Sequence, residues 1–213
     1  MKIIFLLLIC ITLQGYSMDL VKYIKDREGV VYASYLDNLD KPTGGVGHLL
    51  TKEEQLLYPI KYVNGKAIGT PIPESVVNAW LEKDLATAKK AAKKQASQLS
   101  HPATQEFENA LVSVNFQLGQ NWTSKFDTAW THLKGGKYNK AIQEIKFADP
   151  TNKPGMRSKW YKQTRNRVND FEKAIINFRN GVEAQSMQSK ISINKENNKG
   201  MFDKFVELYN NGR

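Results

Sequence analysis

The sequence predicts an α+β protein in which a short strand-rich segment is followed by a much longer helical region. Side chains alternate over residues 31–36, which is typical of a strand, and the turn-forming run 37–42 predicts a hairpin that returns through Thr43. Over residues 73–99 the apolar positions recur every three or four residues, which predicts one long helix. From His101 onward the pattern is almost wholly helical. We therefore expect a small antiparallel hairpin sheet and a larger helical part.

The helical region contains four stretches that each carry apolar side chains on one face. Turn-forming residues such as Gly119 and the pair 135–136 separate the later stretches. The four faces are Val77, Leu81, Leu85 and Ala88; Phe107, Leu111, Val114 and Leu118; Phe126, Ala129, Trp130 and Leu133; and Tyr138, Ala141, Ile142 and Ile145.

The N-terminus has the pattern of a secretory signal peptide over residues 1–17. Lys2 precedes an apolar run at 3–13, and small residues before the end of the segment favour cleavage after Ser17. The run is shorter than the roughly 20 residues of an ordinary membrane-spanning helix. The only cysteine, Cys10, lies inside it, so the mature chain is expected to have neither a disulfide nor a cysteine nucleophile.

Two carboxylates flank the predicted hairpin. Glu28 ends a short helical pattern, Asp37 follows nine residues later at the end of the first strand, and Thr43 begins the returning strand. A hairpin folded back beside the helix end would bring all three to one cleft. Glycoside hydrolysis requires such a pair, one protonated to donate to the leaving oxygen and one ionised. Taken alone, however, a Glu and an Asp at this spacing are more often a helix-end residue and a turn residue.

These residues resemble a known family, the phage-type lysozymes of glycoside hydrolase family 24. Glu28, Asp37 and Thr43 match the spacing of its catalytic Glu, Asp and Thr, and the run G-V-G-H-L-L-T-K that follows is similar to G-I-G-H-L-L-T-K in the T-even members. Three further segments agree in order, at residues 115–119, 158–167 and 178–181. The resemblance covers roughly residues 18–182.

The resemblance implies a two-lobed fold, with the hairpin sheet in a small lobe that a long helix joins to the helical lobe. It implies hydrolysis of the β-1,4 bond between N-acetylmuramic acid and N-acetylglucosamine in peptidoglycan, without a metal or other cofactor. Glu28 would be the general acid, and Asp37 with Thr43 would hold the attacking water on the opposite face of the sugar. The expected product is therefore inverted at the anomeric carbon.

The resemblance also assigns six further positions. His48 with Asp84 would tie the hairpin to the long helix, and Arg167 would position Glu28 and hold the lobes together. The expected substrate-binding residues are Leu49, Phe116 and Gln117.

The chain is basic, with 31 Lys and Arg against 21 Asp and Glu and a formal charge of +10. Charge of this sign favours anionic partners. Four lysines form one stripe of the predicted long helix: Lys89, Lys90, Lys93 and Lys94. This stripe is expected to be a solvated face, or else a surface that holds anionic polymer. We expect a monomer that is exported to the periplasm or secreted, or anchored first and released later. Its expected partner is bacterial peptidoglycan, with anionic wall polymer or a membrane surface as a further candidate and no nucleic acid.

The chain beyond the lysozyme-like domain, residues 18–184, is expected to be a tail. Residues 185–200 are polar and predict a linker. The end of the chain predicts a short amphipathic helix, because its apolar residues are spaced at three and four. They are Phe202, Phe205, Val206 and Tyr209.

Two rival functions remain open at this point. A lytic transglycosylase would cut the same bond with one essential glutamate and no water. A basic, helix-rich protein could instead disrupt membranes or bind nucleic acid without any catalysis. The second reading would depend on the lysine stripe and the final helix, and it leaves the ordered motifs unexplained.

Overall fold

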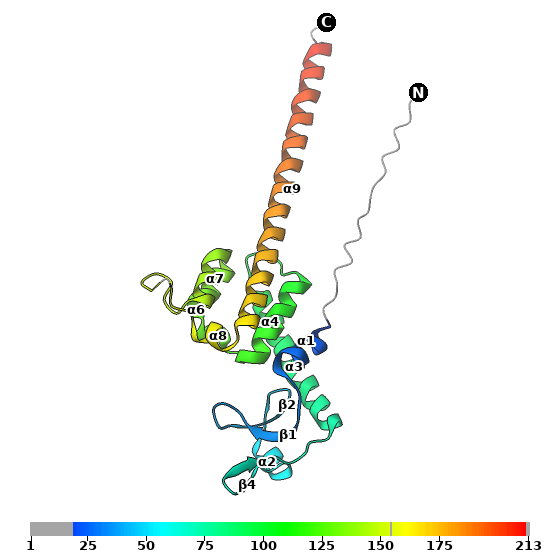
Figure 1. Ribbon diagram of the computed structural model, residues 1–213. Coiled ribbons are helices and arrows are strands. Elements are labelled where there is room, and N and C mark those ends of the chain that lie inside the picture. Colours follow the sequence, from blue (N-terminus) through cyan, green and yellow to red (C-terminus); the bar gives the residue numbers. More distant parts are fainter. Residues whose placement is uncertain (1–18, 154, 212–213) are drawn as a thin grey trace.

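The structure, a computed structural model, describes residues 19–153 and 155–211 (Figure 1). The predicted signal peptide and Cys10 lie outside these residues. The described chain begins with helix α1 (Leu20–Glu28) and enters a three-stranded antiparallel sheet in the order β1-β2-β3. The strands are β1 (Val31–Leu36), β2 (Pro42–Gly45) and β3 (His48–Leu49).

The small lobe also contains helix α2 (Lys52–Leu57) and a second hairpin of β4 (Lys61–Val63) and β5 (Lys66–Ile68). Asn64 and Gly65 form the tight turn of that hairpin with φ values of 51° and 75°. An Asn-Gly pair favours such a turn because both central residues need positive φ.

Helix α3 (Glu74–Ala96) joins the small lobe to the helical lobe, as the long apolar stripe predicts. Strand β2 lies close against it, and this approach requires glycine. A Cβ added at Gly44 would lie 3.4 Å from Cζ3 of Trp80 on α3 and 2.7 Å from Cδ1 of Ile72, just before that helix. One added at Gly45 would lie 3.1 Å from Cγ1 of Val77 on α3. Gly45 also has a φ of 61°, which side chains disfavour. The glycines therefore let the hairpin pack directly on α3.

The larger lobe is helical and has its core around aromatic side chains. Phe107 stacks on Phe178 with ring centroids 4.6 Å apart, and Trp122 meets Phe171 edge to face at 5.8 Å. All four are nearly inaccessible to solvent. The helices are α4 (Gln105–Leu118), α5 (Trp122–Lys125), α6 (Asp127–Lys134), α7 (Tyr138–Lys146), α8 (Lys159–Gln163) and α9 (Arg165–Asn211). A small sheet beside a larger helical region confirms the predicted α+β class.

The C-terminal part of the chain differs from the prediction. Residues 185–200 were expected to be a polar linker, but they are helical and belong to α9, which runs on without interruption. Figure 1 shows this part of α9 extending beyond the body of the protein. Its described side chains, Met187 and Ile191 among them, are exposed, so polarity here marks a solvated helix surface rather than a linker. None of the helices within the described ranges combines the length and apolarity needed to cross a membrane.

Candidate active site

Glu28 is the last residue of α1. Gly29 ends the helix with a φ of 75°, and its N–H donates to the carbonyl of Lys25 at 2.9 Å. The Glu28 side chain is 23% exposed, and its Oε1 accepts a hydrogen bond from Nη1 of Arg167, which is 4% exposed. The pair expected from the family resemblance is therefore in place, although its members lie 139 residues apart.

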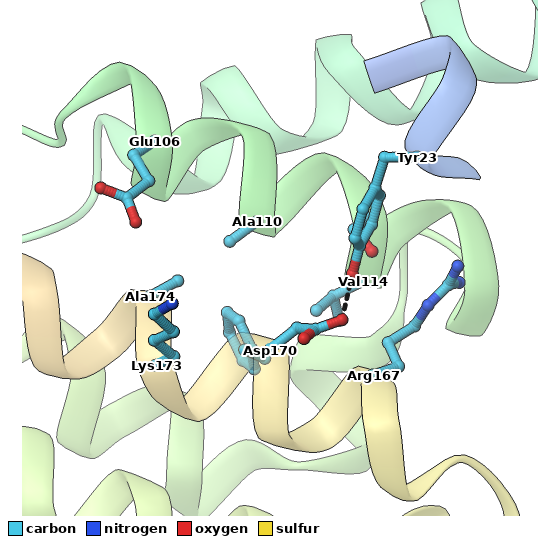
Figure 2. Close-up of a pocket in the computed structure, with 10 residues that line it drawn as sticks. Tyr23, Glu106, Ala110, Val114, Arg167, Asp170, Lys173 and Ala174 are labelled. Carbon is cyan, nitrogen blue, oxygen red and sulfur yellow. Dashed lines mark hydrogen bonds between the residues drawn. The ribbon is translucent and has the colours of Figure 1, made fainter. Parts of the chain in front are cut away.

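Two further side chains fix the end of α1 against α9. Asp170 accepts a hydrogen bond from the Tyr23 hydroxyl at 2.8 Å (Figure 2), and it forms an ion pair with Arg27 at 2.6 Å. Burial raises the pKa of Tyr23, and the hydrogen bond to Asp170 adds to this rise. Our sequence reasoning missed these contacts. The available signal was the position of Asp170 one helical turn after Arg167, which places both on one face of α9.

Asp37 begins the tight turn between β1 and β2. Its Oδ1 accepts hydrogen bonds from the backbone N–H groups of Leu39 at 2.8 Å and Lys41 at 2.9 Å. Within the described part of the chain, no hydrogen bond engages Oδ2. The turn thus holds the carboxylate in one orientation while it leaves an oxygen available for another group.

Thr43 lies on β2 and is 3% exposed, with its hydroxyl donating to the carbonyl of Lys41 at 3.0 Å. Its partner across the strands is Tyr35. Burial raises the pKa of Tyr35, and the negative charges of Asp37 and Glu28 raise it further. The charges of both carboxylates therefore act on the same phenol, which lies across the strands from Thr43.

A hollow of about 400 Å³ lies beside Glu28. It is lined by the end of α1, by Gln117 of α4 and by residues 162–167, from the end of α8 to the start of α9. Gln117 is held in place because its Oε1 accepts a hydrogen bond from Nε1 of Trp160 at 2.9 Å. The structure therefore brings this predicted substrate-binding residue next to the predicted acid.

The other two predicted substrate-binding residues lie elsewhere. Phe116 lines a separate hollow of about 170 Å³ together with Gly47 and Asp84. Leu49 is 53% exposed on β3 and lines neither hollow.

His48 joins three elements of the small lobe. Its Nδ1 lies 2.7 Å from Oδ2 of Asp84 on α3, its Nε2 lies 3.1 Å from Oε2 of Glu54 on α2, and its ring stacks on Trp80 at 4.6 Å. The expected pair with Asp84 is present, whereas Glu54 and Trp80 were missed. Thr51 and Glu54 form a capping box at the start of α2, and that sequence signature could have drawn attention to Glu54.

The network changes the titration of its members. Burial lowers the pKa of His48, but the hydrogen bonds that its ring donates to Asp84 and Glu54 outweigh burial, so the pKa rises above its ordinary value of 6.5. Burial raises the pKa of Glu54, yet the Thr51 backbone N–H and His48 together bring it below 4.5. The charged forms of both groups are therefore favoured near pH 5 to 6. In the described ranges, no group of three or more His, Cys, Asp or Glu side chains is arranged to hold a metal ion.

This combination of fold and site defines a class of protein. A small sheet and a helical lobe joined by one long helix, with a glutamate at a helix end and an aspartate at a hairpin turn, suit a glycoside hydrolase that uses two carboxylates. A sequence model of the family described as phage lysozyme matches residues 25–167, more than half of the chain. The chain belongs to the phage lysozyme family.

The chain is also similar to a curated protein of a bacteriophage. The chain is 26% identical over 170 residues to the pre-baseplate central spike protein Gp5 of Enterobacteria phage T4. The match covers 75% of this chain but only 28% of that protein, so the chain spans less than a third of that relative's length. Membership of the family supports a peptidoglycan hydrolase of the lysozyme type.

Proposed function

We propose that this protein is a lysozyme that hydrolyses the β-1,4 bond between N-acetylmuramic acid and N-acetylglucosamine in bacterial peptidoglycan. One observation carries the proposal: Glu28, held by Arg167, borders a hollow of about 400 Å³. The charge of Glu28 and that of Asp37 both raise the pKa of Tyr35, which lies across the strands from Thr43. Membership of the phage lysozyme family supports the class of substrate.

Glu28 is proposed to be the general acid that protonates the leaving glycosidic oxygen. Arg167 engages Oε1, so Oε2 is left to face the sugar. Burial of most of the side chain keeps water from competing for that oxygen. The contact to Arg167 therefore orients the acid as well as fastening α1 to α9.

Asp37 and Thr43 are proposed to hold the attacking water. Asp37 keeps Oδ2 for a water proton because the turn occupies Oδ1. Thr43 donates its own proton to Lys41, so its hydroxyl oxygen can only accept from the water. A water between this pair and the sugar would attack the face opposite Glu28 and invert the anomeric carbon. Inverting enzymes place their two carboxyl groups about 6.5–9.5 Å apart to make room for it.

We also propose that the protein acts on the wall after export, because the first 17 residues have the pattern of a signal peptide. The basic charge would favour contact with anionic wall polymer or a membrane surface.

The test is the release of reducing ends from purified peptidoglycan by the wild-type protein and by Glu28→Gln. We expect release by the wild type and a loss of at least about 100-fold in the variant, because general-acid catalysis contributes about 10²–10⁴-fold. Glu82→Gln, an exposed change on α3, is the matched control and should keep full activity. Products with 1,6-anhydro ends would instead identify a lytic transglycosylase. Equal clearing of cells by the wild type and Glu28→Gln without sugar release would mean that the basic surface acts alone.

A further inference from the structure

The end of the small lobe carries large apolar side chains that face solvent. Figure 1 shows α2 and β4 at the end of the molecule opposite the C-terminal end of α9. On α2, Leu56 is 83% exposed and Leu57 is 69% exposed, and on the hairpin that follows, Val63 and Ile68 are about half exposed. Single exposed apolar residues are normal, but several gathered in one place mark an interaction surface.

One face of the β4–β5 hairpin combines apolar side chains with positive charge. Residues directly opposite each other in an antiparallel pair lie on the same face. Val63 pairs with Lys66, and Lys61 pairs with Ile68, so these four side chains share a face. The other face carries Tyr62, which lines a hollow together with residues at the end of α2. The face with the two lysines is therefore turned away from α2, and all four of its residues are exposed.

Hydrogen bonds hold the hairpin and α2 in place against β1. The N–H of Ser34 on β1 donates to the carbonyl of Thr70 at 2.9 Å, and the N–H of Thr70 donates to Oγ of Ser34 at 2.9 Å. The Thr70 hydroxyl donates to the carbonyl of Pro59, between α2 and β4, at 2.6 Å. The two elements thus present their exposed side chains from fixed positions at one end of the lobe.

The composition of this surface selects the chemistry of its partner. The four apolar side chains have no hydrogen-bonding group, whereas a saccharide needs polar contacts in a concave site. A lipid bilayer suits a surface of mixed apolar and basic side chains. Apolar groups can enter between the headgroups, while the long stems of lysines carry their ammonium groups to the phosphates. Positive charge favours anionic headgroups.

We propose that this surface, the small-lobe tip, docks on an anionic lipid bilayer. The tip consists of Leu56, Leu57, Lys61, Val63, Lys66 and Ile68. The charges beside it on α2 do not oppose the docking, because Lys52 offsets Glu53, and Glu54 is engaged by His48 and Thr51. Lys61 and Lys66 therefore set the sign of the local charge.

The consequence for hydrolysis rests on the proposed function. Docking would concentrate an exported lysozyme where the wall faces the membrane. The tip contains none of the residues proposed to act on the sugar, so docking and hydrolysis can be measured apart.

The experiment adds a tryptophan to the tip of the full-length protein. The four natural tryptophans, Trp80, Trp122, Trp130 and Trp160, are buried, so a new exposed one reports its own contact with lipid. Val63→Trp places it on the tip, and Ile191→Trp is the matched control at a similarly exposed position on α9. The vesicles contain equal parts of phosphatidylglycerol and phosphatidylcholine, and the phosphatidylcholine carries brominated acyl chains that quench tryptophan. We expect saturable quenching of Val63→Trp and little change in Ile191→Trp. Absence of quenching in Val63→Trp, or equal quenching in both, would overturn the proposal.

The apolar contribution is tested in the Val63→Trp protein by adding Leu56→Gln and Leu57→Gln. The affinity for these vesicles should fall at least about tenfold, because burying even one leucine favours the bound state by about that factor or more. Met187→Gln with Ile191→Gln makes a comparable change at exposed positions of α9 and should leave the affinity within about twofold. An unchanged affinity in the leucine variant would overturn insertion of the tip.

The charge contribution is tested in the same way with Lys61→Gln and Lys66→Gln. The affinity should fall about 25-fold, since each basic residue near an anionic surface contributes about fivefold. Lys89→Gln with Lys90→Gln removes the same charge from exposed positions of α3 and should have little effect. An equal loss in the two lysine variants would mean that overall charge attracts the protein, and it would overturn the assignment to the tip. A loss with the lysines but none with the leucines would indicate an anionic polymer in place of a bilayer.

Release of reducing ends from purified, lipid-free peptidoglycan separates this inference from the proposed function. Leu56→Gln with Leu57→Gln should release sugar at the wild-type rate, and a loss of release would assign these side chains to the glycan and overturn the bilayer as partner. Binding of vesicles through the tip without any release by the wild type would overturn the proposed function and leave the docking surface standing. Release with no quenching of Val63→Trp would overturn only the docking.

Discussion

Replacing Asp84 by Asn tests the network that joins the β2–β3 hairpin to the connecting helix. The Asp84 carboxylate lies 2.7 Å from Nδ1 of His48, and Glu54 lies 3.1 Å from Nε2. Asn keeps the shape of the side chain but lacks the charge that favours the protonated imidazole. The substitution therefore removes one charge-assisted hydrogen bond and brings the pKa of His48 back toward its ordinary value.

The size of the effect follows from the exposure of the partners. A hydrogen bond to a charged group contributes about 1.5–3 kcal/mol. The Asp84 side chain is 34% exposed and that of His48 is 10% exposed, so solvent screening reduces the expected loss to about 1–2 kcal/mol. At about 2–4 °C per kcal/mol for a chain of this size, the melting temperature should fall by about 2–8 °C.

The loss should depend on pH in a definite direction. The pKa of His48 is raised above 6.5 because its two carboxylate partners outweigh burial, so its contribution is complete below about pH 6.5. That contribution disappears as pH rises through the folded-state value. The pKa of Glu54 is lowered from 4.5 despite burial, so its contribution is present above about pH 4.5 and is lost as pH falls further. The cost of Asp84→Asn is therefore greatest between these limits.

Urea unfolding at pH 5.5 and pH 9 measures this difference directly. We expect Asp84→Asn to be clearly less stable than the wild type at pH 5.5 and close to it at pH 9. Glu82→Gln, on the same helix but exposed, should match the wild type at both values. An equal loss at the two pH values would refute the electrostatic argument, and so would no loss at pH 5.5.

Three further substitutions test other parts of the site. Thr43→Val should lower the rate of reducing-end release at least about 100-fold, and a near-normal rate would exclude the proposed role in holding water. The lost hydrogen bond to the Lys41 carbonyl should lower the melting temperature by a few degrees only. Gly44→Ala should reduce the free energy of unfolding in urea by about 1–3 kcal/mol, since the added carbon would lie 2.7 Å from Ile72; unchanged stability would show that Ile72 gives way freely. Asp170→Asn breaks the 2.6 Å ion pair with Arg27, which is about one-third exposed, and should cost about 1 kcal/mol or less in the same assay. A larger loss would mean that this contact stabilises more than the end of α1.

Local patterns in the sequence predicted most of the elements. The turn-forming run 37–42 predicted a hairpin returning through Thr43, and β1 and β2 pair antiparallel on either side of it. The stripe at 77, 81, 85 and 88 predicted α3, and its members are buried. The polar run 185–200 was predicted to be a linker, but it belongs to α9. Low hydrophobicity is common both to linkers and to the surface of an exposed helix, and the run contains no proline that would end the helix.

Contacts between distant segments were harder to predict. The spacing of Glu28 and Asp37 suggested a cleft, but only the resemblance to a family pointed to Arg167 as the partner of Glu28. The resemblance did not point to the contacts that Tyr23 and Arg27 make with Asp170. Their side chains meet because α1 reaches the first turns of α9, and no short-range rule brings together residues 147 positions apart.

The sequence by itself thus determined the α+β class, the hairpin turns and the presence of the two carboxylates. These features depend on backbone preferences and periodicity over a few residues, which can be read from the chain. Only the tertiary structure decided which groups fix those carboxylates, why His48 has a raised pKa, and where α4 and α9 leave a hollow between them. The physical reason is that burial, pairing and packing gaps arise only once segments far apart in the chain share one space.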